Sequence, residues 1–194
     1  MMTDISTGVA DRTSIAGRAW LAGSATWLVA AAIGAAADDG STQFYVAESV
    51  WLVAQLLLLV GLVDLRAVRP DAGRRLGRIG FGVAVVGRVV FVAAELIALV
   101  DGAESEAVLP IGALLTAIGM ALVGIATVRA GAWAGWRRYT PLAVGVYPFL
   151  FMFPLVALDA GPEVGVALWA LPTAALGAAV LGATAPVVAR PPTT

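Results

Sequence analysis

The sequence predicts an all-α fold, a polytopic bundle of six transmembrane helices with both termini in the cytoplasm. The first observation behind this prediction is composition, because 60% of the 194 residues are hydrophobic and only 13% are charged. Soluble domains are about 45–50% apolar and about 25% charged. The second is a series of six apolar segments, and the third is a regular alternation of charge between the connectors that join them. Together they predict a multi-pass protein of the cytoplasmic membrane.

Each apolar segment is expected to form one helix. A chain inside a membrane has to satisfy its backbone hydrogen bonds within the segment, and it needs about 20 residues to cross. The expected helices cover residues 19–37, 44–65, 79–100, 107–128, 141–158 and 164–186. They form a transmembrane domain from 19 to 186, with cytoplasmic tails at 1–18 and 187–194. The lipid bilayer is therefore the first partner that the sequence predicts.

The charges of the connectors set the predicted orientation. Basic residues occur in the second and fourth connectors and in the C-terminal tail: Arg66, Arg69, Arg74, Arg75, Arg78, Arg129, Arg137, Arg138 and Arg190. The first, third and fifth connectors hold acids and no basic residue: Asp38, Asp39, Asp101, Glu104, Glu106, Asp159 and Glu163. Because Arg-rich connectors stay in the cytoplasm, this pattern predicts that both termini are inside. Trp20 and Trp136 are then expected at the inner interface, and Tyr45 and Trp51 at the outer one.

Small residues and prolines mark where the helices are expected to approach or bend. Gly112, Thr116 and Gly119 have the spacing of a close helix–helix contact, which we expect to lie within the bundle. Prolines inside the spans remove backbone donors and are expected to kink their helices. These prolines are Pro110, Pro148, Pro154 and Pro172. Apart from such kinks, we expect six short helices without broken segments.

Two charged residues lie inside the third apolar segment, where a charge costs about 2.5–3.5 kcal/mol on insertion scales. Arg88 is near the middle of the segment, and Glu95 follows seven residues later, so both side chains share one helical face. Gln55 and Glu48 are also seven residues apart, and antiparallel packing would place Gln55 level with Arg88 and Glu48 level with Glu95. The sequence therefore predicts a polar ladder between the second and third helices, with Tyr147 as a further candidate.

Two interpretations of this ladder stay open. In the first, its residues form a binding or proton-exchange site, the usual role of charges inside a membrane. In the second, Arg88 is neutralised by one buried carboxylate and only fixes the register of the helices.

The sequence lacks residues and motifs that many functional sites require. It contains no Cys and no His, which excludes disulfides, thiolate nucleophiles and histidine-based metal or proton-relay sites. It also lacks the motifs of nucleotide binding, zinc proteases and serine hydrolases. No two acids within a span have the spacing of metal ligands, so we expect no metal and no cofactor. Nucleic acid is not an expected partner, because topology explains the short Arg clusters.

Two stretches of the chain resemble a known type of protein. They read VGIATVRAGAWAGWRRYTPLAVGVYPFLFMFPL at residues 123–155 and GRVVFVAAELIALV at residues 87–100. With them, most of the chain resembles an uncharacterised family of small six-span membrane proteins of high-GC bacteria. The resemblance implies the architecture and brings no activity or site residues.

Three functions compete. The first is binding or transport of a small molecule or ion, with Arg88 recognising an anionic or polar group and Glu95 or Glu48 exchanging protons. The second is an intramembrane enzyme on a lipophilic, isoprenoid-like substrate with Glu95 or Glu48 as general acid, broadly similar to integral-membrane terpene cyclases. The third is a non-catalytic subunit whose small-residue faces bind another membrane protein or a second copy of the same chain, which would give a homo-oligomer. The sequence leaves the catalytic residues of any such enzyme unassigned.

Overall fold

The computed structural model describes residues 3–68, 70–72, 74–103, 107–158 and 162–183, and these residues form an all-α bundle of six helical rods. The first four rods are single helices: α1 (Thr3–Gly34), α2 (Thr42–Val68), α3 (Arg75–Asp101) and α4 (Val108–Ala130). The fifth rod is made of η1 (Gly135–Tyr139), α5 (Thr140–Tyr147), η2 (Pro148–Met152) and α6 (Phe153–Ala157). The sixth consists of α7 (Pro162–Leu168) and α8 (Ala170–Ala183). Arg69, Glu104, Glu106, Asp159, Arg190, the side chain of Glu163 and the 187–194 tail lie outside the described part of the chain.

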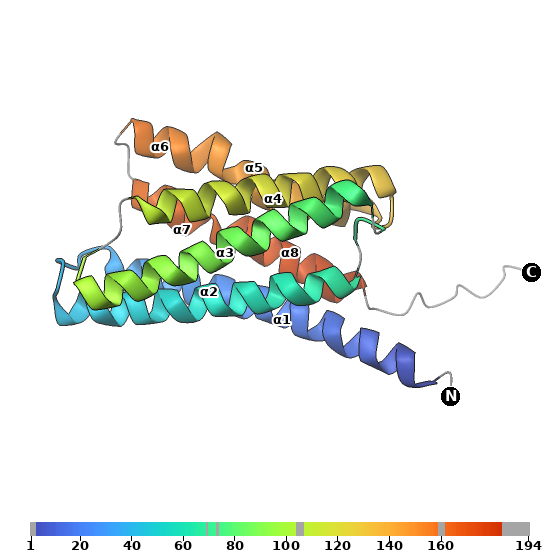
Figure 1. Ribbon diagram of the computed structural model, residues 1–194, viewed down its shortest axis with the longest axis horizontal. Helices are drawn as coiled ribbons and strands as arrows, with labels where there is room; N and C mark the ends of the chain where they lie inside the picture. Colours follow the sequence, from blue (N-terminus) through green and yellow to red (C-terminus); the bar gives the residue numbers. More distant parts are fainter. Residues whose placement is uncertain (1–2, 69, 73, 104–106, 159–161, 184–194) are drawn as a thin grey trace, which may run out of the picture.

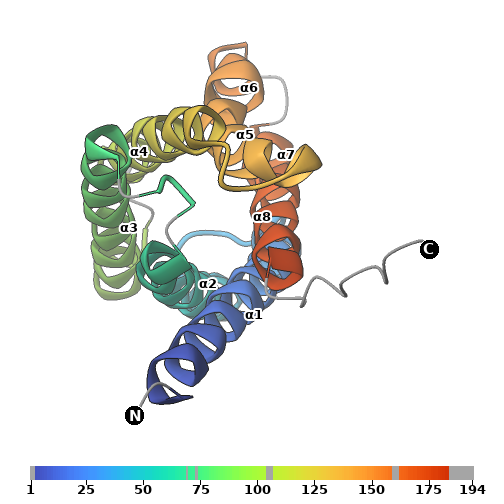
Figure 2. The ribbon, with the colours of Figure 1, turned by 90° about the vertical axis from the view of Figure 1, so that its right-hand side faces the viewer.

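The rods close into a ring. Along the chain α1 packs on α2, α2 on α3, α3 on α4 and α4 on α5, while α8 packs on both α5 and α1. Figure 2 shows the ring down its axis, and Figure 1 shows that successive rods run antiparallel. The expected contact between the second and third helices is confirmed. The described end of α8 and the start of α1 lie at the same end of the bundle (Figure 1).

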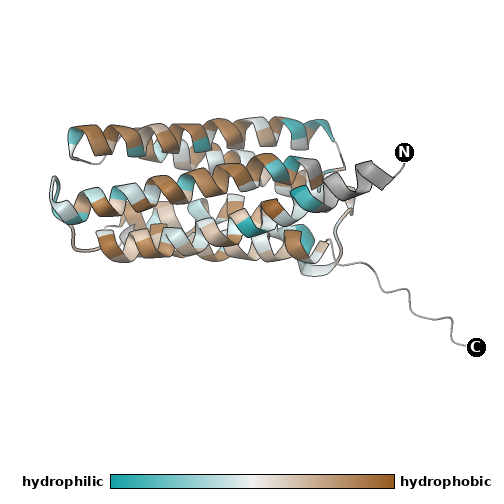
Figure 3. Ribbon diagram, turned by 90° about the horizontal axis from the view of Figure 1, so that it is seen from below, coloured by the Kyte–Doolittle hydropathy of each residue, from teal (hydrophilic) through white to brown (hydrophobic). Residues whose placement is uncertain are grey.

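Five stretches of the described chain are long and apolar enough to cross a membrane. They are Thr42–Arg66, Arg75–Asp101, Val108–Ala130, Gly135–Ala157 and Val164–Ala183. Hydrophobic residues cover most of the length of the rods (Figure 3), and Val53, Val60 and Val86 on their outer faces are about half exposed. The chain is thus a polytopic membrane protein. Helix α1 is outside this set, and it begins at Thr3, well before the expected start at residue 19.

The helices approach one another through glycines. A Cβ atom on Gly87 of α3 would lie 2.5 Å from the backbone nitrogen of Thr116 in α4. A Cβ on Gly119 would lie 2.7 Å from the carbonyl oxygen of Gly80 and would also meet the backbone of Ala84. Because lipid supplies no hydrophobic force between helices, such close backbone contacts provide the packing energy. The expected intramolecular role of the small residues on α4 is confirmed.

The fifth and sixth rods are interrupted, which corrects the expectation of unbroken segments. The α-helix stops at Pro148, where one turn of π-helix follows, so the expected irregularity at this proline is confirmed. The sixth rod breaks at Trp169, because Pro172 has no N–H to donate to the carbonyl of Leu168 four residues earlier. Pro110 lies in the first turn of α4, where a missing N–H leaves the helix intact.

Replacing Gly119 with Val should destabilise the bundle by about 1–3 kcal/mol, because the new side chain would collide with the backbone of α3. The matched control is Gly82→Val in α3, since a Cβ on Gly82 meets no atom within 4 Å. Thermal unfolding of the detergent-purified protein, followed by tryptophan fluorescence, measures the difference. Equal melting temperatures for the two variants would contradict the close α3–α4 contact.

Candidate functional site

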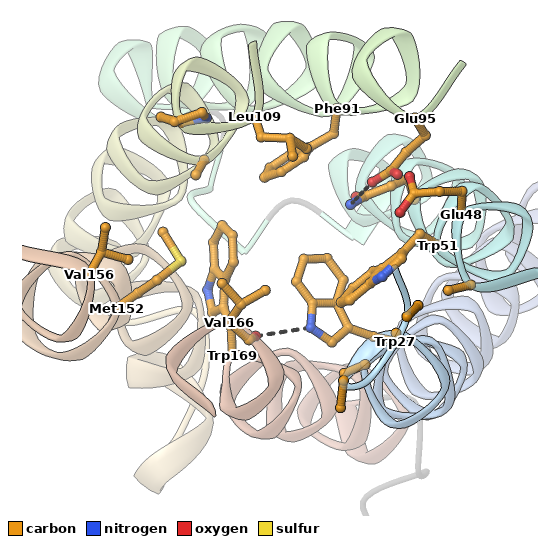
Figure 4. A pocket seen from close by; sticks show the side chains of 18 of the residues that line it. Trp27, Glu48, Trp51, Phe91, Glu95, Leu109, Met152, Val156, Val166 and Trp169 are labelled. Atoms are coloured by element: carbon orange, nitrogen blue, oxygen red, sulfur yellow. Dashed lines mark hydrogen bonds between the residues drawn. The ribbon is translucent and has the colours of Figure 1, made fainter. Parts of the chain in front are cut away.

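A cavity of about 410 Å³ lies inside the ring, in the half of the bundle nearest the α1–α2 connector. Its walls come from all six rods and are mostly apolar (Figure 4). Its residues extend from Gln55 in the middle of α2 to Asp39 in the connector itself. The cavity therefore reaches from the level of the polar ladder toward one end of the bundle.

Two carboxyl groups face this cavity. Glu48 of α2 and Glu95 of α3 both line it, although the side chains are only 3% and 4% exposed. The two carboxyl groups lie side by side within hydrogen-bonding reach (Figure 4). The amide nitrogen Nε2 of Gln55 donates to Oε1 of Glu95 at 3.5 Å, which joins the pair to the middle of α2. The seven-residue spacings of the sequence thus bring Glu48, Gln55 and Glu95 together.

Arg88 is completely buried next to the cavity but is not among the residues that line it. Its Nη1 donates to Oε1 of Gln55 at 2.7 Å, so the Gln55 amide links the guanidinium to Glu95. The guanidinium carbon lies 5.3 Å from the ring centroid of Trp169, 5.5 Å from that of Phe91 and 5.8 Å from that of Trp27. Among the described residues, the Nε and Nη2 atoms have no hydrogen-bond partner. Aromatic faces therefore supply much of the stabilisation that water would give this cation.

Aromatic rings form much of the rest of the cavity wall. Trp27 packs edge-on against Trp51, with 4.6 Å between the ring centroids, and against Trp169, at 5.8 Å. Phe91 of α3 lies 6.4 Å from Trp27 and 6.3 Å from Trp169. These side chains come from the first, second, third and sixth rods. The cluster therefore joins parts of the chain that only ring closure brings together.

The two proline breaks hold this aromatic wall in place. Pro148 deprives the carbonyl of Val144 of its helical donor, and the indole N–H of Trp169 donates to that oxygen at 2.9 Å. At the second break, the backbone N–H of Trp169 donates to Val166 rather than four residues back to Gly165. The Val166 oxygen also accepts the indole N–H of Trp27 at 3.0 Å, as the dashed line in Figure 4 marks. Both interruptions thus supply acceptors that orient tryptophans toward the cavity.

Tyr147 and Thr116 lie elsewhere. The hydroxyl of Tyr147 donates to the Gly165 carbonyl at 3.0 Å, and its ring stacks on Phe151. Thr116 is fully buried at the contact with Gly87. Neither residue lines the cavity.

The aromatic part of the site was not predicted from the sequence. Trp27, Phe91 and Trp169 were not predicted to lie near the ladder, and Trp51 was expected at the outer interface. Trp20 is fully buried inside the bundle, whereas Trp136 is 57% exposed. Phe91 could have been found, because its position three residues after Arg88 places it on the same helical face.

A second, smaller cavity of about 270 Å³ lies at the other end of the bundle, next to Val68, Trp133 and Arg137. Arg137 closes part of that end by donating from Nη1 to the carbonyl of Gly182 at 2.7 Å. The layer between the two cavities is filled with completely buried apolar side chains: Leu58, Leu62, Met120, Val123, Val144, Leu176 and Val180. The bundle is thus hollow toward the α1–α2 connector and packed in its middle.

The described residues include no group of three His, Cys, Asp or Glu side chains that could hold a metal ion. Comparisons of the chain with protein-family models, with curated proteins and with solved structures give no match. The resemblance to small six-span membrane proteins therefore stays a prediction. Function has to be inferred from the geometry of the cavity.

Replacing Gln55 with Leu should cost about 3–5 kcal/mol of stability, because it removes the hydrogen-bond acceptor of a buried guanidinium. The double variant Gln55→Leu/Arg88→Met should recover most of that loss, since it removes the charge together with its partner. Chemical denaturation in detergent of the wild type, Gln55→Leu, Arg88→Met and the double variant gives the coupling free energy between Gln55 and Arg88. Additive losses in the double variant would show that Arg88 does not depend on Gln55.

Proposed function

We propose that this membrane protein binds a small molecule in the 410 Å³ cavity and exchanges it for a proton held by Glu48 and Glu95. The observation that carries the proposal is a pair of adjacent carboxyl groups on the wall of an apolar, ligand-sized cavity. Small-molecule sites are typically cavities of about 300–1,000 Å³ with mostly apolar walls and a few convergent polar groups. Transport is the activity that this arrangement supports best.

The charge balance of the cluster supports proton exchange. A hydrogen bond between two carboxyl groups requires one proton on the pair, because ionised carboxylates only accept. One shared proton leaves the pair with a single negative charge, which balances the positive charge of Arg88. Net charge inside a membrane is costly, so a neutral cluster is favoured. A ligand that enters and a proton that leaves can keep this balance.

The proposed membrane arrangement has α1 as a sixth span and both termini in the cytoplasm. Its apolar stretch from Ala19 to Gly34 packs along α2 and α8, which supports a place in the bilayer. The Arg-rich α2–α3 and α4–α5 connectors then face the cytoplasm. With this orientation the large cavity opens to the outside, and the packed layer around Leu58 and Leu62 closes it toward the cytoplasm. Transport would require the closed and open ends to alternate.

An intramembrane enzyme is the second candidate, and the aromatic wall favours it. The rings of Trp27, Trp51, Phe91 and Trp169 could stabilise a carbocation formed when Glu48 or Glu95 protonates an isoprenoid-like substrate. This reaction needs a protonated carboxyl group on the wall of an apolar cavity, and proton-coupled transport would use the same two features. Product formation separates the two functions, because a transporter returns its ligand chemically unchanged.

Labelling of single cysteines tests the orientation, and the natural chain has no cysteine to interfere. Ala36→Cys, next to the cavity end, should react with a membrane-impermeant maleimide added to intact cells. Ala132→Cys, at the opposite end, should react only after the cells are permeabilised. Both sites are exposed, so a difference reports the side of the membrane. The reverse pattern would invert the proposed topology.

Labelling with dicyclohexylcarbodiimide tests the site, because this lipophilic reagent modifies protonated carboxyl groups in apolar surroundings. Mass spectrometry of the treated full-length protein should locate the adduct on Glu48 or Glu95. The double variant Glu48→Gln/Glu95→Gln should lose on the order of nine-tenths of the labelling or more, because this pair is expected to hold the protonated carboxyl group that reacts.

Asp64→Asn is the matched control, since Asp64 is an acid of the same helix α2 that does not line the cavity. This variant should be labelled like the wild type. Absence of labelling in the wild type, or equal labelling of the double variant, would contradict a small-molecule site with a protonated carboxyl pair.

A further inference from the structure

We propose that the ligand of the cavity is a monovalent organic cation, an amine or quaternary ammonium group on an apolar body. This inference rests on the proposed small-molecule site and names the class of molecule that the site selects. It follows from the charges on the cavity wall, from the rings beside them and from the charge balance of the buried cluster.

Every charged side chain on the described wall of the cavity is acidic. Glu48 and Glu95 lie inside it and Asp39 lies at its mouth, on the exposed α1–α2 connector. Arg88, the one basic residue near them, is fully buried against three aromatic rings and does not line the cavity. A wall with one sign of charge attracts ligands of the other sign, and low-dielectric surroundings strengthen the effect. A cation is therefore the charged ligand that can reach a complementary group.

Each carboxyl group has an aromatic neighbour one turn away on its own helix. Trp51 follows Glu48 by three residues on α2, and Phe91 precedes Glu95 by four on α3. All four side chains line the cavity, and Figure 4 shows the carboxyl groups between the rings. Aromatic faces are the groups that recognise quaternary ammonium ions, and the adjacent carboxyl groups supply the opposite charge. The same wall already holds one cation, because the guanidinium of Arg88 lies against Trp27, Phe91 and Trp169.

The charge balance distinguishes a cation from an anion. When a monovalent cation enters, the shared proton of Glu48 and Glu95 can leave, and the two carboxylates then balance the ligand and Arg88. The cluster is neutral before and after the exchange, with one proton released for each cation bound. A monovalent anion would require a second proton on the pair and contact with Arg88, which is fully buried and does not line the cavity.

The size and lining of the cavity favour an organic cation over a bare metal ion. A volume of about 410 Å³ suits a small organic molecule. Hard metal ions such as Ca²⁺ take about 6–8 oxygen ligands. Apart from Asp39 at the mouth, the described wall offers side-chain oxygens only from Glu48, Gln55 and Glu95.

The test uses the full-length protein in lipid nanodiscs and three probes of similar shape. Benzyltrimethylammonium is the cation, neopentylbenzene replaces its nitrogen with carbon, and toluenesulfonate is the anion. Quenching of tryptophan fluorescence measures binding, because Trp27, Trp51 and Trp169 line the cavity. We expect the cation to bind at least about tenfold more tightly than the other two probes. Calorimetry in buffers of different ionisation enthalpy should show about one proton released per cation bound.

Variants add an internal control. Glu48→Gln and Glu95→Gln should each weaken binding of the cation at least about tenfold and abolish proton release, whereas Asp64→Asn should change neither. The comparison of the three probes on wild-type protein does not depend on whether these variants fold.

The outcomes separate the inference from the function on which it rests. Preferred binding of benzyltrimethylammonium with proton release supports both. Equal or tighter binding of neopentylbenzene or toluenesulfonate would overturn the proposal that the ligand is a cation, but not the proposed small-molecule site. Binding of benzyltrimethylammonium without proton release would overturn the proposed exchange of the ligand for a proton. If no probe binds and dicyclohexylcarbodiimide does not label the pair, the proposed function itself fails.

Discussion

The structure depends on the burial of one permanent charge, the guanidinium of Arg88, at the middle of an apolar bundle. A guanidinium cannot lose its proton in a protein, so its surroundings have to compensate the charge. The bundle does this with the Gln55 amide, with three aromatic faces and with a nearby carboxyl pair. These partners come from α1, α2, α3 and the sixth rod, so the same charge constrains the register of four rods.

The site exists because the rods pack differently along their length. In the middle of the bundle, large aliphatic side chains fill the ring, and glycines such as Gly119 and Gly145 let the backbones of α3, α4 and α5 touch. Toward the α1–α2 connector, indoles and phenyl rings line an interior that stays open. A protein that needed only stability would fill this volume, because an empty cavity forfeits packing energy. The combination of an unfilled apolar interior with carboxyl groups on its wall is what points to a ligand.

Much of this arrangement could be predicted from the sequence, but the aromatic wall could not. The six rods and the meeting of Glu48, Gln55, Arg88 and Glu95 follow from apolar length and from seven-residue spacing on two consecutive helices. Trp27 and Trp169 belong to the first and sixth rods, which become neighbours only through ring closure. Hydropathy gives the depth of a tryptophan but not the face of the helix that it occupies, so the burial of Trp20 and the place of Trp51 on the cavity wall were not predicted. The break at Trp169 depends on how the chain around Pro172 satisfies its carbonyls, which spacing alone does not specify.

The hydrogen bond from the Trp169 indole to the Val144 carbonyl has a mechanical consequence. It joins the interruption in the sixth rod to the interruption in the fifth, so the two breaks are coupled through one bond. Any displacement of the chain at Trp169 would be transmitted to the backbone next to Pro148 and on to α6, which follows that proline. Helices α2 and α3, which carry the acids, have no such interruption.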